Sequence, residues 1–71
     1  MHIVINGQGR EIAELSGPAT VANLISVLGL KGDRVAIEQN GAIVTRSEWT
    51  GAVVQDGDKF EIVHFVGGGS R

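Results

Sequence analysis

Hydrophobic and polar residues alternate near the start of the chain, as they do in a half-buried β-strand. In residues 2–6, Ile3 and Ile5 fall on one side of the predicted strand. The cluster Asn6-Gly7-Gln8-Gly9 follows, and Asn-Gly supplies the positive φ angles that a hairpin turn needs. Residues 10–15 alternate again, up to a Ser-Gly-Pro break. The first fifteen residues therefore predict an antiparallel hairpin.

One amphipathic helix is predicted after this break, over residues 21–28. Its apolar residues recur at positions i, i+3, i+4 and i+7, on one stripe of a helix: Val21, Leu24, Ile25 and Leu28. Thr20 is placed to cap the first turn, and Gly29 is placed to end the helix in the left-handed conformation. Such a stripe needs a sheet to cover it.

The second half of the chain supplies the strands for that sheet. Apolar and polar residues alternate over residues 34–39, and Asn40-Gly41 predicts a second hairpin turn. Residues 42–45 are expected to pair with the strand over residues 34–39. Residues 47–49 are typical of a short helical turn, and residues 56–58 form a tight turn. A last strand is expected over residues 59–66, with Phe60 and Ile62 on one face.

This order of elements predicts an α+β fold of the β-grasp type, a mixed four- to five-stranded sheet with one main helix packed across it. A right-handed crossover would place the last strand beside the first and parallel to it. The folded domain is expected to span residues 1–66. Residues 67–71 are expected to form a flexible glycine tail, because glycine loses much backbone entropy on ordering and has no side chain to pack.

A tail of glycines could pass along a channel too narrow for other residues and deliver a carboxylate to an active site in another protein. The alternative interpretation is an ordinary unstructured terminus or a Gly-Ser linker.

Composition narrows the possible functions. The chain has 71 residues, enough for one small domain, and no cysteine, which excludes disulfides and thiolate chemistry. Its net charge is −2 and its basic residues are scattered singly, so no nucleic-acid partner is expected. The first residues have neither the basic region of a signal peptide nor a long apolar run, so we expect a cytoplasmic protein without a membrane anchor.

Few polar residues suggest a chemical site. His2 and His64 would lie on neighbouring strands, but two imidazoles without a third ligand are weak grounds for a metal site, and none is predicted. Asp56 and Asp58 are better explained as caps of their turn than as paired catalytic carboxylates. Trp49 is expected to cover the open end of the sheet. No catalytic residue and no enzyme activity are predicted.

Two blocks of sequence resemble the ThiS sulfur carriers of thiamin biosynthesis, members of the ubiquitin-like β-grasp superfamily. The blocks span residues 35–49 and 56–69, about the last half of the chain. They carry Asn-Gly, Arg-x-x-Trp, Asp-Gly-Asp and the ending His-Phe-Val-Gly-Gly-Gly. Molybdopterin-synthase carriers share the fold and the diglycine but typically end in a Pro-Pro-Val-x-Gly-Gly motif, so the ending favours ThiS.

The resemblance implies a carrier whose C-terminal glycine, Gly69, is adenylated and then converted to a thiocarboxylate. It further implies a ThiF-type adenylating enzyme, a sulfur donor such as a cysteine desulfurase or a persulfide, and thiazole synthase as partners. ATP and Mg²⁺ would be used by the adenylating enzyme, with no cofactor bound by the chain itself. The expected tail and partner-binding residues are His64, Phe65, Val66, Gly67 and Gly68. The alternative for residues 64–66 is ordinary packing against the first strand.

Two alternatives and one further requirement follow from the sequence. The chain could serve another sulfur pathway, such as molybdopterin, cysteine or tRNA thiolation, or it could be a β-grasp interaction module that carries no sulfur. The carrier hypothesis also requires removal of Ser70 and Arg71, because a peptide bond to Ser70 leaves no carboxylate at Gly69. A processing protease is therefore an expected partner.

Overall fold

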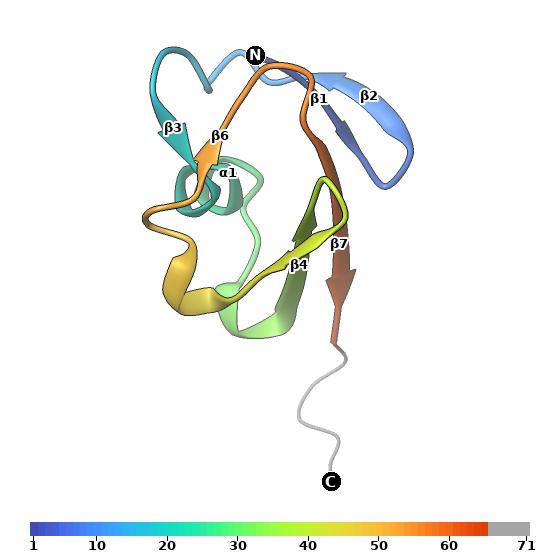
Figure 1. Ribbon diagram of the computed structural model, residues 1–71, viewed down its shortest axis with the longest axis vertical. Helices are drawn as coiled ribbons and strands as arrows, with labels where there is room; N and C mark the ends of the chain where they lie inside the picture. Colours follow the sequence, from blue (N-terminus) through green and yellow to red (C-terminus); the bar gives the residue numbers. More distant parts are fainter. Residues whose placement is uncertain (66–71) are drawn as a thin grey trace, which may run out of the picture.

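Five strands form one mixed sheet, with the last strand at its centre (Figure 1). The computed structural model describes residues 1–65, and residues 66–71 lie outside the described part. The sheet order is β2-β1-β7-β4-β5, with β1 at His2–Ile5, β2 at Gln8–Glu11, β4 at Val35–Gln39, β5 at Ala42–Val44 and β7 at Lys59–His64. The predicted β-grasp arrangement is confirmed.

The central strand β7 is held on both edges. It runs parallel to β1, with Val4 opposite Lys59 and Ile5 opposite Phe60. Along its other edge it runs antiparallel to β4 over five residue pairs, from Val35 opposite His64 to Gln39 opposite Phe60. The predicted parallel pairing of the first and last strands is therefore confirmed, and the chain leaves the domain from the middle of the sheet.

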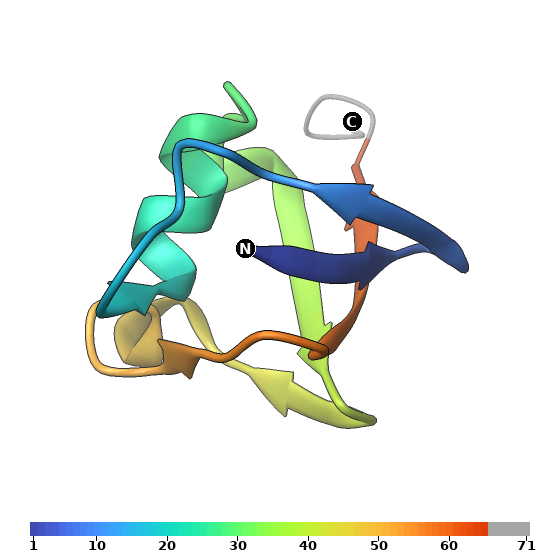
Figure 2. The same cartoon turned by 90° about the horizontal axis from the view of Figure 1, so that it is seen from above.

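Helix α1 (Val21–Val27) packs against one face of this sheet (Figure 2). Its stripe residues Val21 and Leu24 are fully buried, and they meet Ile3, Phe60 and other apolar side chains of the strands. Thr20 caps the helix as predicted, since its hydroxyl accepts the backbone N–H of Asn23 at 3.2 Å while the Asn23 side chain accepts the N–H of Thr20 at 2.8 Å. None of the helices or strands within residues 1–65 covers the opposite face.

Three boundaries predicted for the first half of the chain are wrong. The first turn uses only Asn6 and Gly7, whose φ angles are 51° and 82°, so Gln8 and Gly9 already pair with β1. The second strand ends at Glu11 and does not reach residue 15, because Ile12 and Leu15 turn inward toward the core. Helix α1 ends one residue early, with Leu28 as its C-cap and Gly29 at φ 71°.

A second, two-stranded sheet closes the other end of the domain. It pairs β3 (Ala19–Thr20) with β6 (Val53–Val54), and neither strand is predicted by the sequence pattern because two residues carry no periodicity. Short 3₁₀ helices lie at Gly32–Arg34 and Arg46–Glu48. Trp49 is buried after the second of them and donates its indole N–H to the carbonyl of Val44 at 3.0 Å, which fits its predicted role as a cover.

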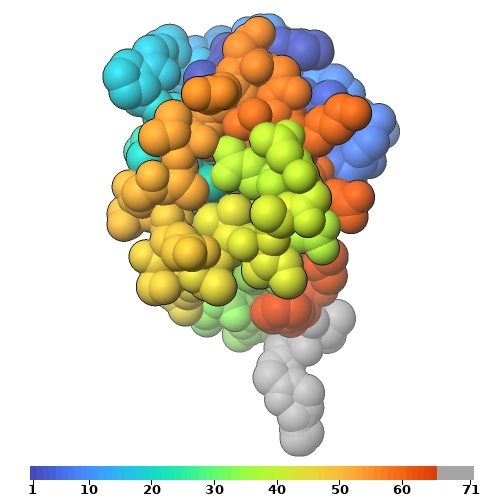
Figure 3. Space-filling view, in the orientation of Figure 1, coloured from blue at the N-terminus to red at the C-terminus, as the bar shows by residue number. Residues whose placement is uncertain are grey.

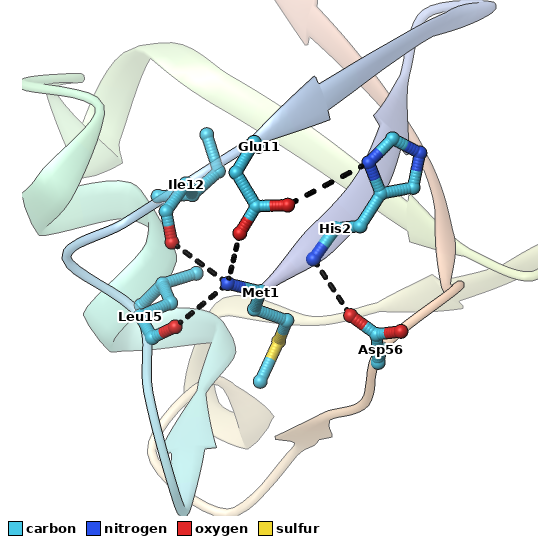
Figure 4. A network of polar contacts seen from close by, with 6 residues as sticks. All are labelled: Met1, His2, Glu11, Ile12, Leu15 and Asp56. Carbon is cyan, nitrogen blue, oxygen red and sulfur yellow. Dashed lines mark hydrogen bonds and ion pairs between the residues drawn. The ribbon is translucent and has the colours of Figure 1, made fainter.

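The amino-terminal ammonium group is fixed inside a small polar network (Figure 4). It donates to Glu11 Oε2 at 2.8 Å and to the backbone carbonyls of Ile12 and Leu15 at 3.0 and 3.1 Å. The backbone N–H of His2 donates to Asp56 Oδ1 at 2.7 Å. The ammonium bonds tie the start of the chain to residues 11–15, and the His2 bond ties it to the loop before β7. Across residues 1–65, no helix has the length and apolar character needed to span a membrane.

Candidate functional site

The carboxyl end of β7 is the point from which the glycine-rich sequence continues. His64 pairs with Val35 and is the last residue of the strand, two residues short of the predicted end at residue 66. Phe65 is still fixed by its backbone, whose N–H donates to the carbonyl of Arg34 at 2.8 Å. Its side chain is 54% exposed. The last described residue therefore presents an aromatic ring to solvent from a held backbone.

Two asparagines hold β7 from opposite sides. The side chain of Asn6 makes a bidentate contact with the backbone of Ile62, accepting its N–H at 2.8 Å and donating to its carbonyl at 3.2 Å. On the other side, Asn40 accepts the N–H of Lys59 with its side chain at 3.0 Å and donates its own N–H to the Lys59 carbonyl at 2.7 Å. Each asparagine belongs to an Asn-Gly turn, so both hairpin turns also brace the central strand.

Asp58 fixes the turn that feeds β7. Its carboxylate accepts the backbone N–H of Gln55 at 2.8 Å and the side-chain amides of Gln39 and Asn40 at 2.9 and 3.1 Å. Partial burial works to raise the pKa of the Asp58 carboxyl, but these hydrogen bonds outweigh it and hold the pKa below its ordinary value. Asp58 therefore caps a backbone N–H of its own turn, as predicted. Asp56 also caps a backbone N–H, but that N–H belongs to His2 at the start of β1 and not to the turn.

The uncovered face of the sheet carries apolar and acidic side chains beside the end of β7. We call it the outer face and define it by six exposed residues: Ala36, Glu38, Ile43, Glu61, Val63 and Phe65. Figure 3 shows the yellow-green atoms of the β4–β5 hairpin next to the red atoms at the end of β7. Ile43, Val63 and Phe65 are all more than half exposed. Such a cluster on one face is typical of a protein interaction surface.

The histidines do not form a common site. His2 lies at the start of β1, where its Nδ1 is 3.8 Å from Glu11, whereas His64 lies at the far end of β7. Parallel pairing aligns the beginnings of these two strands, so the two imidazoles are at opposite ends of the sheet. Within residues 1–65, no three histidine, aspartate or glutamate side chains are grouped to hold a metal ion.

A surface hollow of about 520 Å³ lies away from the end of β7, beside the second 3₁₀ helix. It contains one carboxylate among the described residues, that of Glu48. Hydrogen bonds from the backbone and side chain of Thr45 lower the pKa of Glu48. Because Glu48 Oε1 accepts the N–H of Thr45 at 2.9 Å, this carboxylate is used to cap the helix. The hollow therefore offers no free acid or base for catalysis.

Comparison with known protein families decides the assignment. The sequence model of the ThiS family matches residues 3–69, which include nearly the whole described fold and the three glycines. The chain belongs to the ThiS family. ThiS proteins are small ubiquitin-like sulfur carriers of thiamin biosynthesis, and they are carriers rather than enzymes.

Individual ThiS relatives agree with this assignment. The sulfur carrier protein ThiS of Bacillus subtilis is 31% identical over 61 residues, which cover 86% of this chain and 92% of the relative. The crystal structure of the thiamine biosynthesis protein ThiS of Geobacter metallireducens superposes with a TM-score of 0.82 at 30% identity, over 97% of this chain and 100% of that one. The ThiS resemblance and the ubiquitin-like β-grasp fold are thus confirmed.

A second kind of relative is much longer. A thiazole synthase of Paramagnetospirillum magneticum is 46% identical over 70 residues, which make up 99% of this chain and 21% of the relative. A thiazole synthase of Magnetococcus marinus is 39% identical over 71 residues, again 21% of its length. The chain therefore spans about a fifth of these relatives.

The structure places some of the predicted ThiS site residues. His64 and Phe65 lie at the end of β7 and are exposed, while Val66, Gly67, Gly68 and Gly69 lie outside the described residues. The predicted domain limit at residue 66 and the flexible tail lie there too, and both stay predictions. The hydrogen bonds from Asn6 and Asn40 to β7 were not predicted. In the sequence, each Asn-Gly pair is already explained by a hairpin turn.

Proposed function

We propose that this ThiS-family chain carries sulfur as a thiocarboxylate on Gly69 and donates it for the synthesis of the thiamin thiazole. In this account a ThiF-type enzyme adenylates the Gly69 carboxylate with ATP and Mg²⁺. The chain itself supplies no catalytic group. Its own part is to be recognised by each partner and to present its C-terminal residue. Because the first step consumes ATP, the carrier would act in the cytoplasm.

The chemistry needs activation because a carboxylate is anionic and its oxygen is a poor leaving group. Transfer of AMP to the Gly69 carboxylate releases pyrophosphate and places a good leaving group on the same carbon. Attack by the terminal sulfur of a persulfide then forms a carbon–sulfur bond and releases AMP, giving an acyl disulfide. A second thiol breaks the sulfur–sulfur bond, supplies the two electrons, and leaves the thiocarboxylate on Gly69.

One observation carries the proposal: the sequence that follows the fixed end of β7 is Val-Gly-Gly-Gly, and the family match ends at Gly69. The backbone is held up to Phe65 by its bond to Arg34, and β7 is braced on both sides by asparagines. A strand held in this way gives the residues that follow a defined starting point. The absence of Cβ atoms in three consecutive residues suits a narrow channel in a partner.

Similarity to two thiazole synthases supports thiazole synthase as the enzyme that consumes the sulfur. In the Paramagnetospirillum protein, a segment 46% identical to this chain occupies 21% of a thiazole synthase. A carrier-like segment and the synthase thus share one polypeptide there. We propose that the present chain meets a thiazole synthase in the same reaction, with a cysteine desulfurase or another persulfide as the sulfur donor.

Removal of the residues after Gly69 is part of the proposal. In the sequence, the Gly69 carbonyl is joined to Ser70 by a peptide bond, which adenylation does not attack. We propose that a protease cuts between Gly69 and Ser70 before activation. Until that cut the carrier would be inactive.

The test uses two forms of the chain with a ThiF-type enzyme of the same organism. The full chain and a form that ends at Gly69 are each incubated with ATP and Mg²⁺, and intact-mass spectrometry follows the AMP ester. We expect the ester only on the form that ends at Gly69. A Gly69→Ala variant of the same length is the matched control, and we expect a much slower reaction because a Cβ restricts the backbone and crowds the channel.

Two results would count against the proposal. Adenylation of neither form, with an enzyme that modifies its own known carrier, would show that the chain is not a carrier. In that case the alternative of an interaction module would replace it. An ester on a carboxylate other than that of Gly69, located by fragmentation, would overturn the assignment of the site.

A further inference from the structure

The two asparagines that brace β7 are each followed by a glycine, and Asn-Gly is the dipeptide that loses the asparagine amide most readily. The backbone nitrogen of the glycine attacks Cγ of the asparagine, and a glycine has no Cβ to hinder the approach. The chain has two such pairs, Asn6-Gly7 and Asn40-Gly41, and all four residues are exposed. Both hairpin turns are therefore candidate sites of chemical modification.

The attacking nitrogen is unoccupied in both turns. Within residues 1–65, no backbone carbonyl accepts the N–H of Gly7 or of Gly41. A Cβ built on either glycine meets nothing within 4 Å apart from its chain neighbours, so both turns are open to water. The related pair Asp56-Gly57 differs, because the N–H of Gly57 donates to the carbonyl of His2 at 2.7 Å. That hydrogen bond holds the nitrogen and its proton in place.

The hydrogen bonds to β7 oppose the reaction. The Asn6 side chain accepts the N–H of Ile62 at 2.8 Å and donates to the Ile62 carbonyl at 3.2 Å. Attack on Cγ turns a planar amide into a tetrahedral centre and expels the amide nitrogen, so Asn6 must first release Ile62. The rate of amide loss therefore follows the fraction of time that the turn is detached from the strand.

The two turns differ in the group that holds the amide nitrogen. Asn6 donates to a neutral backbone carbonyl, whereas Asn40 donates to the carboxylate of Asp58 at 3.1 Å. A hydrogen bond to a charged acceptor is roughly twice as strong as a neutral one. The negative charge of Asp58 also opposes the negative charge that develops on Asn40 Oδ1 during the attack. Since the two asparagines have φ angles of 51° and 52°, the turn itself does not distinguish them.

We propose that Asn6 is a site of spontaneous deamidation in the folded chain and that Asp58 protects Asn40 from the same reaction. The nitrogen of Gly7 loses its proton to hydroxide and forms a bond to Cγ of Asn6. The bond from Cγ to the amide nitrogen breaks, and the leaving group takes up a proton and departs as ammonia. Water then adds to either carbonyl of the resulting succinimide ring and breaks one carbon–nitrogen bond. The product is aspartate or isoaspartate, and no oxidant or reductant is needed.

Both products act on the end of β7. An aspartate at position 6 still accepts the N–H of Ile62, but it places a carboxylate oxygen against the Ile62 carbonyl, where the amide donated. Isoaspartate adds a carbon to the backbone of the turn and so disturbs the pairing of Ile5 with Gln8. Deamidation therefore loosens the strand just before Phe65, the last described residue. This inference does not depend on the proposed function.

The experiment compares the folded chain with the urea-unfolded chain at mildly alkaline pH, in water enriched in a heavy oxygen isotope. Peptide mapping by mass spectrometry locates each new carboxylate by its label, and an isoaspartate-specific methyltransferase identifies the branched product. In the folded chain, Asn40 should react at least about tenfold more slowly than Asn6. In urea the two rates should be similar, and Asn6 should react about tenfold faster than in the folded chain. Asn23 precedes a leucine and is the internal control, with no reaction expected.

Two variants test the cause of the difference. Asp58→Asn replaces the charged acceptor by a neutral one, so Asn40 should react about tenfold faster while Asn6 keeps its rate. A general loosening of the fold would accelerate both asparagines. Asn6→Asp supplies one product directly as a standard. Hydrogen exchange at Ile62 should be faster in Asn6→Asp than in the wild type, and faster again in the purified isoaspartate form.

Four results would overturn the inference. The first is an Asn40 rate equal to or above that of Asn6 in the folded chain, and the second is an unchanged Asn40 rate in Asp58→Asn. The third is equal reaction of Asn6 in the folded and unfolded chains, which would show that the bonds to Ile62 do not restrain it. The fourth is the absence of label at Asn6 in the folded chain when the unfolded chain is fully labelled. None of these measurements involves sulfur transfer, so each leaves the proposed function standing.

Discussion

Phe65 is tied to Arg34 by its backbone while its own side chain stays on the surface. Its N–H donates to the Arg34 carbonyl at 2.8 Å, and 54% of the residue remains exposed. The second phenylalanine, Phe60, lies five residues earlier on the opposite face of β7 and is only 1% exposed. Strand β7 therefore carries one aromatic ring in the core, and the residue that follows the strand presents a second ring to solvent.

The two phenylalanines predict opposite effects on truncation. Phe65→Ala should lower the free energy of unfolding by less than about 1 kcal/mol, because the ring is largely solvated in the free protein. It should weaken binding of the adenylating enzyme at least about tenfold. The control Phe60→Ala should cost about 3–5 kcal/mol of stability through cavity formation. Urea unfolding and calorimetric binding measure the two effects. A Phe65→Ala variant that loses stability but binds normally would make Phe65 a packing residue.

Replacement of Asn6 separates its two roles. Asn6→Gly preserves the positive φ angle of the turn, so a loss of stability isolates the side-chain bonds to Ile62. Those two bonds should be worth about 1–3 kcal/mol together. Asn6→Asp keeps the acceptor for the Ile62 N–H and should lose less. Hydrogen exchange at Ile62 should accelerate in Asn6→Gly. Unchanged exchange and stability would show that Asn6 matters only for the turn.

Asp58 predicts a loss of stability in acid. Its folded pKa lies below the ordinary value of 3.8, so its contribution is complete above that value and disappears as the pH falls through the lower, folded pKa. Asp58→Asn should lower the free energy of unfolding at neutral pH by about 1–2 kcal/mol. At about pH 2–3 the variant and wild type should be closer in stability. Urea unfolding at both pH values checks this, and a constant difference between the proteins would contradict it.

An extension before Met1 should destabilise the domain. The free ammonium donates to Glu11, Ile12 and Leu15, whereas the amide of an extended chain has one N–H. The expected cost is about 1–3 kcal/mol, measured by comparing chains with and without a short N-terminal tag. Glu11→Gln is the control and should cost under about 1 kcal/mol, because Glu11 is 66% exposed. Equal stability with and without the tag would show that the network is not a structural element.

The strength of the periodic signal explains how much of the fold could be predicted. Ile3, Ile5, Phe60 and Ile62 alternate strictly, so β1 and β7 were predicted with their buried faces. The helix was predicted from its stripe and from Thr20. The strands β3 and β6 could not be predicted, because each has only two residues and pairs with a partner more than thirty positions away in the sequence.

Only the part of the candidate site that forms a recognisable sequence motif could be predicted. The ending from His64 to Gly69 is recognisable without a structure. The pairing of Glu38 with Glu61 on the outer face is not, because it depends on the register of β4 and β7, which are far apart in the sequence. Asn6 and Asn40 are each accounted for by an Asn-Gly turn, so the sequence gives no sign of their second role. Only the topology shows that both reach β7.

The most direct test of the sulfur-carrier account follows one sulfur atom. The form that ends at Gly69 is loaded by the adenylating enzyme and a cysteine desulfurase with cysteine labelled by a heavy sulfur isotope, then purified and mixed with thiazole synthase and its other substrates. Mass spectrometry reads the label in the carrier and in the thiazole product. The account predicts that the label leaves Gly69 and appears in the thiazole. A carrier that keeps its label while unlabelled thiazole accumulates would contradict it.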